Sequence, residues 1–139
     1  MRSPLLVGIA PLIDRRAAIG VAGLALYAYA IEFVGLRTGW PYGDFHYAID
    51  LGPTVADVPI GLPVFFLPLV CNGYLLSLLL LGDRARTAWI RLPAVIATVV
   101  AMDFVLDPGA VALGFWTYPG GGSVYGVPFS NFAGWVLSA

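Results

Sequence analysis

Apolar residues gather into three long stretches, and short charged segments separate them. These stretches predict three membrane-spanning helices at residues 17–35, 59–81 and 92–106. Pro59 suits the first turn of the second helix, and Pro108 is expected to stop the third. The third stretch is short for a crossing, which needs about 20 residues, so the arginine before it is expected to extend to the membrane surface.

A fourth apolar segment begins near Phe129 and covers about half of a crossing before the sequence ends. Two explanations stay open: the sequence is a fragment, or another segment completes this span. The predicted fold class is an all-α, polytopic integral membrane helical bundle with three full spans and a partial fourth. Residues 1–139 are expected to form a single membrane domain.

The arginines predict how the helices are oriented. Six of the seven arginines lie before the first span or between the second and third: Arg2, Arg15, Arg16, Arg84, Arg86 and Arg91. Cytoplasmic segments carry the excess of arginine, so these segments are expected inside and the long loops 36–58 and 108–128 outside. Both loops are rich in glycine and aromatic residues. That composition predicts packed caps on the outer face rather than disorder.

The composition narrows the classes of function. The chain is 60% hydrophobic and 11% charged, whereas a soluble domain is about 25% charged, so a membrane protein is expected. The net charge of −1 and the absence of a basic cluster argue against nucleic acid as a partner. Cys71 is the only cysteine and His46 the only histidine, which argues against a protein-only zinc site. Nothing in the chain calls for a metal, nucleotide or redox cofactor.

Three acidic residues lie in the apolar stretches, near the predicted outer face: Glu32, Asp103 and Asp107. A charged carboxylate in the middle of a bilayer costs roughly 2.5–3.5 kcal/mol, so such residues usually pair, hold a proton or do chemistry. Asp103 and Asp107 are four residues apart and share one helical face. Two close carboxyl groups in an apolar setting do not both ionise readily, so at least one is expected to keep its proton. A neutral carboxylic acid beside a carboxylate is an acid/base pair.

Structural explanations of these acids stay open beside the catalytic one. Asp107 directly precedes Pro108 and fits equally well as the cap of a turn at the membrane interface. Glu32 fits a hydrogen bond to Tyr29, an ion pair with Arg37, or a proton relay.

Aromatic residues also concentrate on the predicted outer side. They form either an interfacial belt or the wall of a cavity whose ring faces stabilise a cation, each by up to about 2 kcal/mol. Acids and rings together predict protonation of an isoprenoid double bond, giving a tertiary carbocation that water or another double bond captures. His46 is expected to make a loop hydrogen bond, and Asn131 to orient water. The predicted substrate-binding residues are Tyr42, Tyr47, Trp116, Tyr125, Asn131 and Trp135.

The motifs AYAIEFVGLRTGWPYGDFHYAIDLGP, AMDFVLDPGAVALGFWTY and YGVPFSNFAGWVLSA resemble the bisanhydrobacterioruberin hydratases, a family of membrane carotenoid hydratases with haloarchaeal members. The resemblance implies cofactor-free addition of water to the terminal double bonds of an acyclic carotenoid, from bisanhydrobacterioruberin to bacterioruberin. It implies a multi-pass protein of the cell membrane, a carotenoid substrate in the bilayer, and room for association with other membrane enzymes of carotenoid biosynthesis. Family members usually carry further spans, which agrees with the first of the two explanations above, a fragment of a longer member.

The predicted mechanism assigns a role to each acid. Asp103 is the general acid, and Asp107 or Glu32 takes a proton from the attacking water. Two other functions stay open. One is a membrane lycopene cyclase, in which an internal double bond captures the cation. The other is a non-enzymatic carotenoid-binding or proton-conducting subunit. The residues expected to flank the cation are Trp116, Tyr42, Tyr47 and Tyr125.

Overall fold

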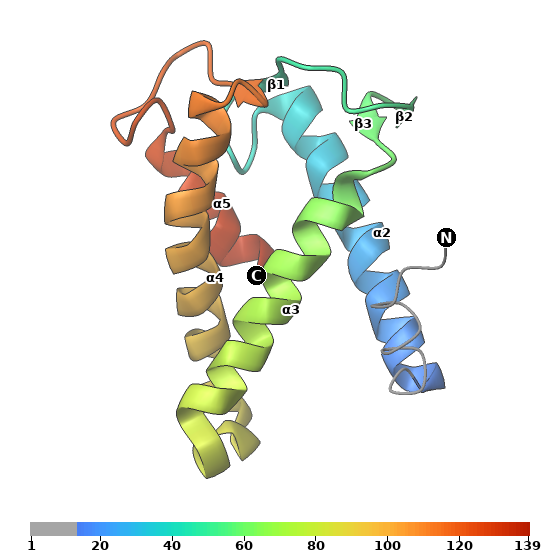
Figure 1. The fold of residues 1–139 in the computed structure, drawn as a ribbon, viewed down its shortest axis with the longest axis vertical. Helices are drawn as coiled ribbons and strands as arrows, with labels where there is room; N and C mark the ends of the chain where they lie inside the picture. The colour runs from blue at the N-terminus through green and yellow to red at the C-terminus, as the bar shows by residue number, and fades with distance from the viewer. Residues whose placement is uncertain (1–13) are drawn as a thin grey trace.

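The computed structural model describes residues 14–139, which are mostly helical (Figure 1). The sequence expectations for the arginine at position 2 therefore lie outside the described residues. The elements in chain order are α2 (Arg15–Thr38), β1 (His46–Tyr47), β2 (Thr54–Val55), β3 (Val58–Pro59), α3 (Leu62–Leu81), the 3₁₀ helix η2 (Gly82–Arg86), α4 (Ala88–Ala112), β4 (Trp116–Thr117) and α5 (Phe129–Ser138).

Three helical segments are long and apolar enough to cross a membrane: α2, α3 together with η2, and α4. The predicted number of long apolar helices is thus confirmed for the described residues. The prediction of an all-α fold missed four short strands, which form two antiparallel pairs, β1 with β4 and β2 with β3. Strands of two residues show no alternation of polar and apolar positions, so a sequence pattern does not reveal them.

Two predictions about proline were wrong. Pro59 does not open the second helix, because it lies in β3 and pairs with Thr54. The helix begins at Leu62, and Pro63 takes the place in the first turn that tolerates a missing N–H. Pro108 does not stop the third helix, because α4 continues through it to Ala112.

The continuation of α4 past Pro108 has a local explanation. Proline removes one backbone donor, but the following turn closes normally, with the Leu113 N–H donating to the Gly109 carbonyl oxygen at 2.9 Å. Membrane helices tolerate such a gap where neighbouring groups compensate. As a result α4 has 25 residues and is long enough to cross a membrane by itself. It ends directly below the loop that carries β4.

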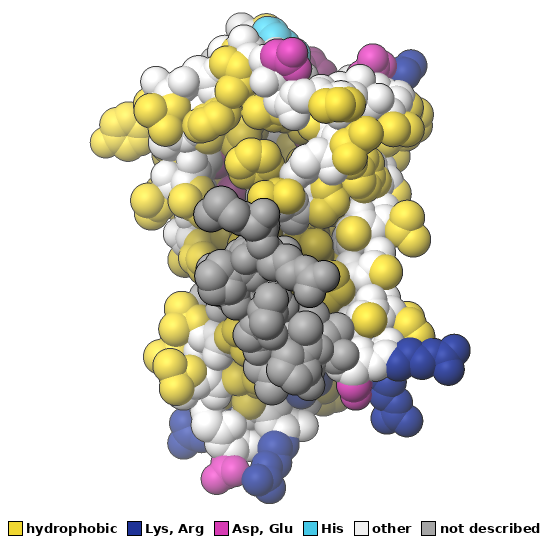
Figure 2. Space-filling model, turned by 45° about the vertical axis from the view of Figure 1, so that its right-hand side comes forward, with side chains coloured by type: hydrophobic (Ala, Val, Ile, Leu, Met, Phe, Trp, Pro, Cys, Tyr) yellow, Lys and Arg dark blue, Asp and Glu magenta, His cyan; other side chains and the backbone are white. Residues whose placement is uncertain are grey.

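The helices bring all three acids to one region of the molecule. In Figure 1 α2 rises, α3 descends and α4 rises again, and α5 descends only part of the way beside them. At the upper end the β1–β4 pair joins the two glycine-rich loops, with His46 opposite Thr117 and Tyr47 opposite Trp116. The expectation that both loops meet at one end is confirmed. Figure 2 shows arginines gathered mainly at the other end. The cytoplasmic location of that end stays a prediction.

A close approach between α3 and α4 fixes the lower half of the bundle. A Cβ atom on Gly73 would lie 2.5 Å from Cγ2 of Val99, which is fully buried. One turn further along α3, the hydroxyl groups of Ser77 and Thr98 lie 3.1 Å apart and share a hydrogen bond. Small residues at such a crossing let two helix backbones approach closely.

We expect Gly73→Ala to destabilise the protein by about 1–3 kcal/mol, because Val99 is β-branched and has no room to move away from a new methyl group. Gly23→Ala is the matched control, since Gly23 lies within α2 and has nothing within 4 Å of the corresponding position. Thermal unfolding in detergent measures both variants. Equal midpoints for the two variants would contradict the close packing of α3 on α4.

Candidate active site

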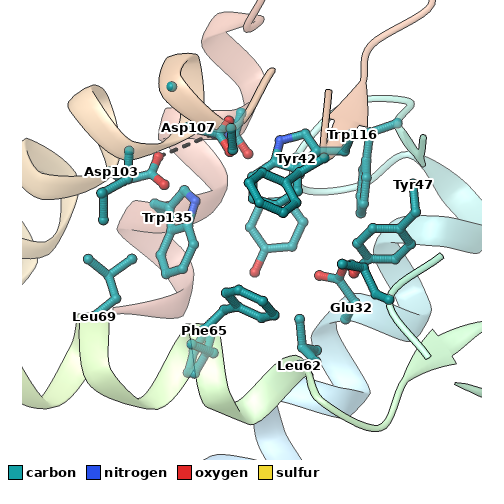
Figure 3. A pocket seen from close by; sticks show the side chains of 18 of the residues that line it. Glu32, Tyr42, Tyr47, Leu62, Phe65, Leu69, Asp103, Asp107, Trp116 and Trp135 are labelled. Atoms are coloured by element: carbon teal, nitrogen blue, oxygen red, sulfur yellow. Dashed lines mark hydrogen bonds between the residues drawn. The ribbon is translucent and has the colours of Figure 1, made fainter. Parts of the chain in front are cut away.

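A cavity of about 400 Å³ lies between the upper halves of the helices, beneath the paired loops (Figure 3). Its wall is mostly apolar and aromatic. Glu32 from α2 and the aspartates Asp103 and Asp107 from α4 all line it. The predicted convergence of the three acids is therefore present in the structure, and each reaches the same cavity from a different position on its wall.

Asp103 and Asp107 lie side by side on one face of α4 and are only 2% and 5% exposed. Asn131 of α5 bridges them: its side-chain nitrogen donates to Asp103 Oδ2 at 3.2 Å and to Asp107 Oδ2 at 2.7 Å. The Tyr118 hydroxyl group also donates to Asp107 Oδ2, at 3.0 Å. Asp107 thus accepts two hydrogen bonds from these side chains, whereas Asp103 accepts one that is longer.

The start of α5 positions the bridging amide. Pro128 precedes the helix, and its carbonyl oxygen accepts from the Asn131 N–H at 3.0 Å, which closes the first turn. Phe132 is buried next to it, against Val127 and Tyr118. The structure shows Asn131 as a donor that holds two carboxyl groups together. Its expected role in orienting water stays a prediction.

The explanation of Asp107 as a turn cap at the interface is wrong. Because α4 continues past Pro108, Asp107 lies inside a helix and is buried on the cavity side. Its carboxyl group meets side chains from α5 and from the loop after β4, not the backbone of a turn.

Glu32 has a partner that sequence spacing did not indicate. The Tyr47 hydroxyl group donates a hydrogen bond to Glu32 Oε1. Neither of the expected partners is used: Arg37 pairs with the exposed Asp57 at 3.0 Å, and no hydrogen bond joins Glu32 to Tyr29 within the described range. The β1–β4 pairing sets Tyr47 opposite Trp116, and so brings two cavity side chains together from distant loops. His46 makes the expected loop hydrogen bond, to Thr117 at 2.9 Å.

Stacked rings build the wall opposite Glu32. Trp135 of α5 stacks on Phe66 with ring centres 5.5 Å apart, and the Tyr42 ring lies 6.2 Å from Trp135. The Tyr42 hydroxyl group is 2.7 Å from Ser138 Oγ, one helical turn beyond Gly134. A Cβ atom on Gly134 would lie 2.5 Å from the Tyr42 ring, so the ring requires glycine there.

One predicted binding residue does not reach the cavity. Tyr125 is 88% exposed and adopts a positive φ of 50° in the loop after β4. The other five, Tyr42, Tyr47, Trp116, Asn131 and Trp135, all line the cavity.

Tyr118 is the polar residue that the predicted site omitted. A signal for it exists, because alternate residues of an extended segment point to the same face, and Tyr118, which directly follows β4, is two residues after Trp116. The apolar wall residues, among them Phe65 and Leu106, carry no comparable signal. Their spacing along a membrane helix is the same whether they face a cavity or lipid.

The tyrosines on the loops above the helices are proton donors at any ordinary pH. Burial raises the pKa of Tyr42, Tyr47 and Tyr118 well above the usual value, and the neighbouring acids Glu32 and Asp107 raise the pKa of the last two further. The indole N–H of Trp116 is also buried and has no hydrogen-bond partner among the described residues. In Figure 3 this nitrogen points toward Asp107. The cavity therefore offers several neutral donors around its acids.

Within residues 14–139, no three His, Cys, Asp or Glu side chains are placed to hold a metal ion together. The acids are held instead by amide and phenol donors. Independence of any cofactor stays a prediction.

Comparison with known proteins gives this arrangement a context. A family model described as "Carotenoid biosynthesis protein" matches residues 1–139. The chain belongs to this family. It is 60% identical, over 99% of its length, to the bisanhydrobacterioruberin hydratase of Haloarcula japonica. The chain spans about half of that relative, 47% of its length. No solved structure matches the chain significantly.

The resemblance inferred from the sequence motifs is thereby confirmed, and with it the assignment to carotenoid biosynthesis and to membrane proteins. The cavity acids and the bridging asparagine belong to a member of this family. The single-domain organisation stays a prediction.

We expect Asn131→Leu to lower the free energy of unfolding by about 1–3 kcal/mol, because two buried carboxyl groups lose their shared donor. Asn72→Leu is the matched control, since Asn72 is exposed on α3. Thermal unfolding in detergent gives both values. If the two variants unfold at the same temperature, the bridge contributes nothing to stability.

We expect Tyr118→Phe to leave the ultraviolet absorbance of tyrosinate in the folded protein unchanged up to about pH 11, although an ordinary tyrosine ionises near pH 10. The reason is that burial keeps the phenol of Tyr118 protonated through this range. The same titration in denaturant is the control, because there the substitution removes one ionising group. A smaller signal from the folded variant would show that Tyr118 ionises normally.

Proposed function

We propose that the protein is a carotenoid hydratase, which adds water to the terminal carbon–carbon double bonds of an acyclic carotenoid. The relative's name suggests the substrate bisanhydrobacterioruberin and the product bacterioruberin. One observation carries the proposal: two buried carboxyl groups, bridged by an amide, face an apolar cavity lined with aromatic rings. An isolated carbon–carbon double bond becomes a tertiary cation when it takes up a proton, so hydration by this route begins with a well-placed proton donor.

The hydrogen bonds distinguish the two aspartates. Asp107 Oδ2 accepts from Asn131 and Tyr118, and these donors favour its charged form. Asp103 receives only the longer bond from Asn131, and its other oxygen has no partner among the described residues. The shared proton therefore resides on Asp103, which lines the cavity and acts as the general acid.

The proposed reaction conserves atoms and protons. Asp103 gives its proton to the less substituted carbon of the terminal double bond, and the other carbon becomes a tertiary cation. The oxygen of a water molecule bonds to this carbon, and the proton it releases passes to Asp107 or Glu32. Return of one proton to Asp103 restores the enzyme. The net change is the addition of one water to one double bond.

The surrounding aromatic rings stabilise the proposed carbocation. Tyr42, Trp116 and Trp135 line the cavity beside the acids, and an aromatic face stabilises a nearby desolvated cation by about 2 kcal/mol. Because the tyrosine hydroxyl groups stay protonated, they do not compete with water as anionic nucleophiles. Tyr125, which was expected to join this group, has no part in the proposal, since it points away from the cavity.

We also propose where the reaction takes place. Three helices suited to crossing a bilayer support a multi-pass protein of the cell membrane, and the arginines gathered at one end support a cytoplasmic location for that end. The carotenoid partner is dissolved in that bilayer, and other membrane enzymes of carotenoid biosynthesis supply it.

We expect Asp103→Asn to lower the rate of hydration by about 10²- to 10⁴-fold, because the amide has no proton to give. The gene is expressed in a host that makes acyclic carotenoids, and the pigments are separated and weighed by mass spectrometry. Asp83→Asn is the matched control: it makes the same chemical change at an exposed carboxyl group in η2, which pairs with Arg86 at the far end.

Each pigment profile has one interpretation. A gain of the mass of water with the unaltered protein and Asp83→Asn, but not with Asp103→Asn, supports the proposal. Hydration that survives in Asp103→Asn removes Asp103 as the acid. With the unaltered protein, a changed pigment of unchanged mass identifies a cyclase instead, and unchanged pigment overturns the proposed hydration in favour of a binding or proton-conducting subunit.

A further inference from the structure

The cavity is closed on one side and open on the other. The lining side chains that are more than half exposed are Phe65 on α3, Val105 and Leu106 on α4, and Leu113, which directly follows α4. The wall that carries Asp103 and Asn131 is buried. The opening therefore lies between α3 and α4. We call the gap between Phe65 and Leu106 the lateral opening.

The packing of α3 on α4 explains where this opening lies. The two helices touch closely at Gly73 and Val99 and spread apart toward the upper end in Figure 1. Phe65 lies about two turns above the contact on α3, and Leu106 about two turns above it on α4. The helices thus form a V whose open end is the mouth of the cavity.

The surroundings of the lateral opening are apolar. Both of its sides are within helical segments apolar enough to cross a membrane, Leu62–Arg86 and Ala88–Ala112. Its rim is made of apolar side chains only. The paired loops cover the cavity from above, and Tyr47 and Trp116 face each other within that cover.

The size of the cavity limits what it holds. At about 400 Å³ the cavity lies toward the lower end of the range for pockets that hold drug-sized ligands, about 300–1,000 Å³, whereas an acyclic carotenoid is a much longer chain. A bound carotenoid must therefore leave most of its length outside. The lateral opening leads this length into the hydrocarbon of the bilayer, where it needs no further cover.

We propose that an acyclic isoprenoid chain enters end first from the lipid, through the lateral opening, and that only its terminal segment occupies the cavity. The inference rests on the proposed function and specifies the route to that site. The terminal double bond reaches Asp103 at the closed side, and the rest of the chain stays between α3 and α4 and in the bilayer.

Gly109 offers a way to close the opening without disturbing the core. It lines the cavity on α4, one turn above Val105, and nothing lies within 4 Å of the position of an added Cβ atom. Gly23 on α2 has the same free space but does not line the cavity. The two glycines form a matched pair for large substitutions.

We expect hydration to fall stepwise in the series Gly109→Ala, Gly109→Leu and Gly109→Phe, by about tenfold or more at Phe, because the ring must be displaced before the chain enters. Gly23→Phe should hydrate as the unaltered protein does. Leu106→Trp fills the same opening from three residues earlier on α4 and should act like Gly109→Phe. Thermal unfolding of every variant identifies any loss of folding. Unchanged hydration in folded Gly109→Phe and Leu106→Trp overturns the lateral route.

A binding measurement separates this inference from the proposed chemistry. Lycopene, an acyclic carotenoid, is added to the purified protein in detergent, and quenching of tryptophan fluorescence reports its approach to Trp116 and Trp135. Quenching that is lost in Gly109→Phe but kept in Gly23→Phe supports the lateral route even if no water is ever added. Equal quenching in both variants overturns it, whatever the protein does to the carotenoid.

Discussion

The structure depends on keeping Asp103 and Asp107 together in an apolar interior. One Asn131 amide donates to both, and Tyr118 adds a second donor to Asp107. These donors come from α5 and from the loop after β4, so α5 must return along α4 and the loop must fold over its end. Leaving buried carboxyl groups without donors costs more than these hydrogen bonds contribute when formed. The carboxyl pair therefore fixes the arrangement of the upper half of the molecule.

The remaining parts of the site follow from that arrangement. The loop that brings Tyr118 also carries β4, and β4 pairs with β1 to set Tyr47 over Glu32. The cover thus links the acid on α2 to the pair on α4. On the other side, the contact of Gly73 with Val99 keeps the lower parts of α3 and α4 together and leaves their upper parts apart. A cavity with polar groups at its closed side and apolar side chains at its mouth suits a long hydrocarbon with one reactive end.

Membership of the carotenoid biosynthesis family and this site chemistry agree. A carotenoid has no charged group for an enzyme to bind, so recognition relies on shape and on contact with rings, while reactivity relies on one proton. The proposed function assigns these tasks to different residues. Aromatic residues from the loops and α5 form the walls, and the acids on α2 and α4 are proposed to supply and receive protons. These acids lie on helices, which keep a proton donor in place better than loops do.

The sequence by itself determined the helices, the three acids and the family, because hydropathy, carboxylates in apolar stretches and long motifs are local features. The order of the spans also predicted that the two loops lie at the same end of the helices. Only the tertiary structure decided that Asn131 bridges the aspartates, that Tyr47 rather than Tyr29 or Arg37 meets Glu32, and that Tyr125 points outward. The tertiary structure also decided that α4 continues past Pro108. The cost of the backbone hydrogen bond that proline cannot donate depends on the neighbouring groups. Contacts between distant segments depend on strand pairing and helix crossing, and no spacing along one segment encodes them.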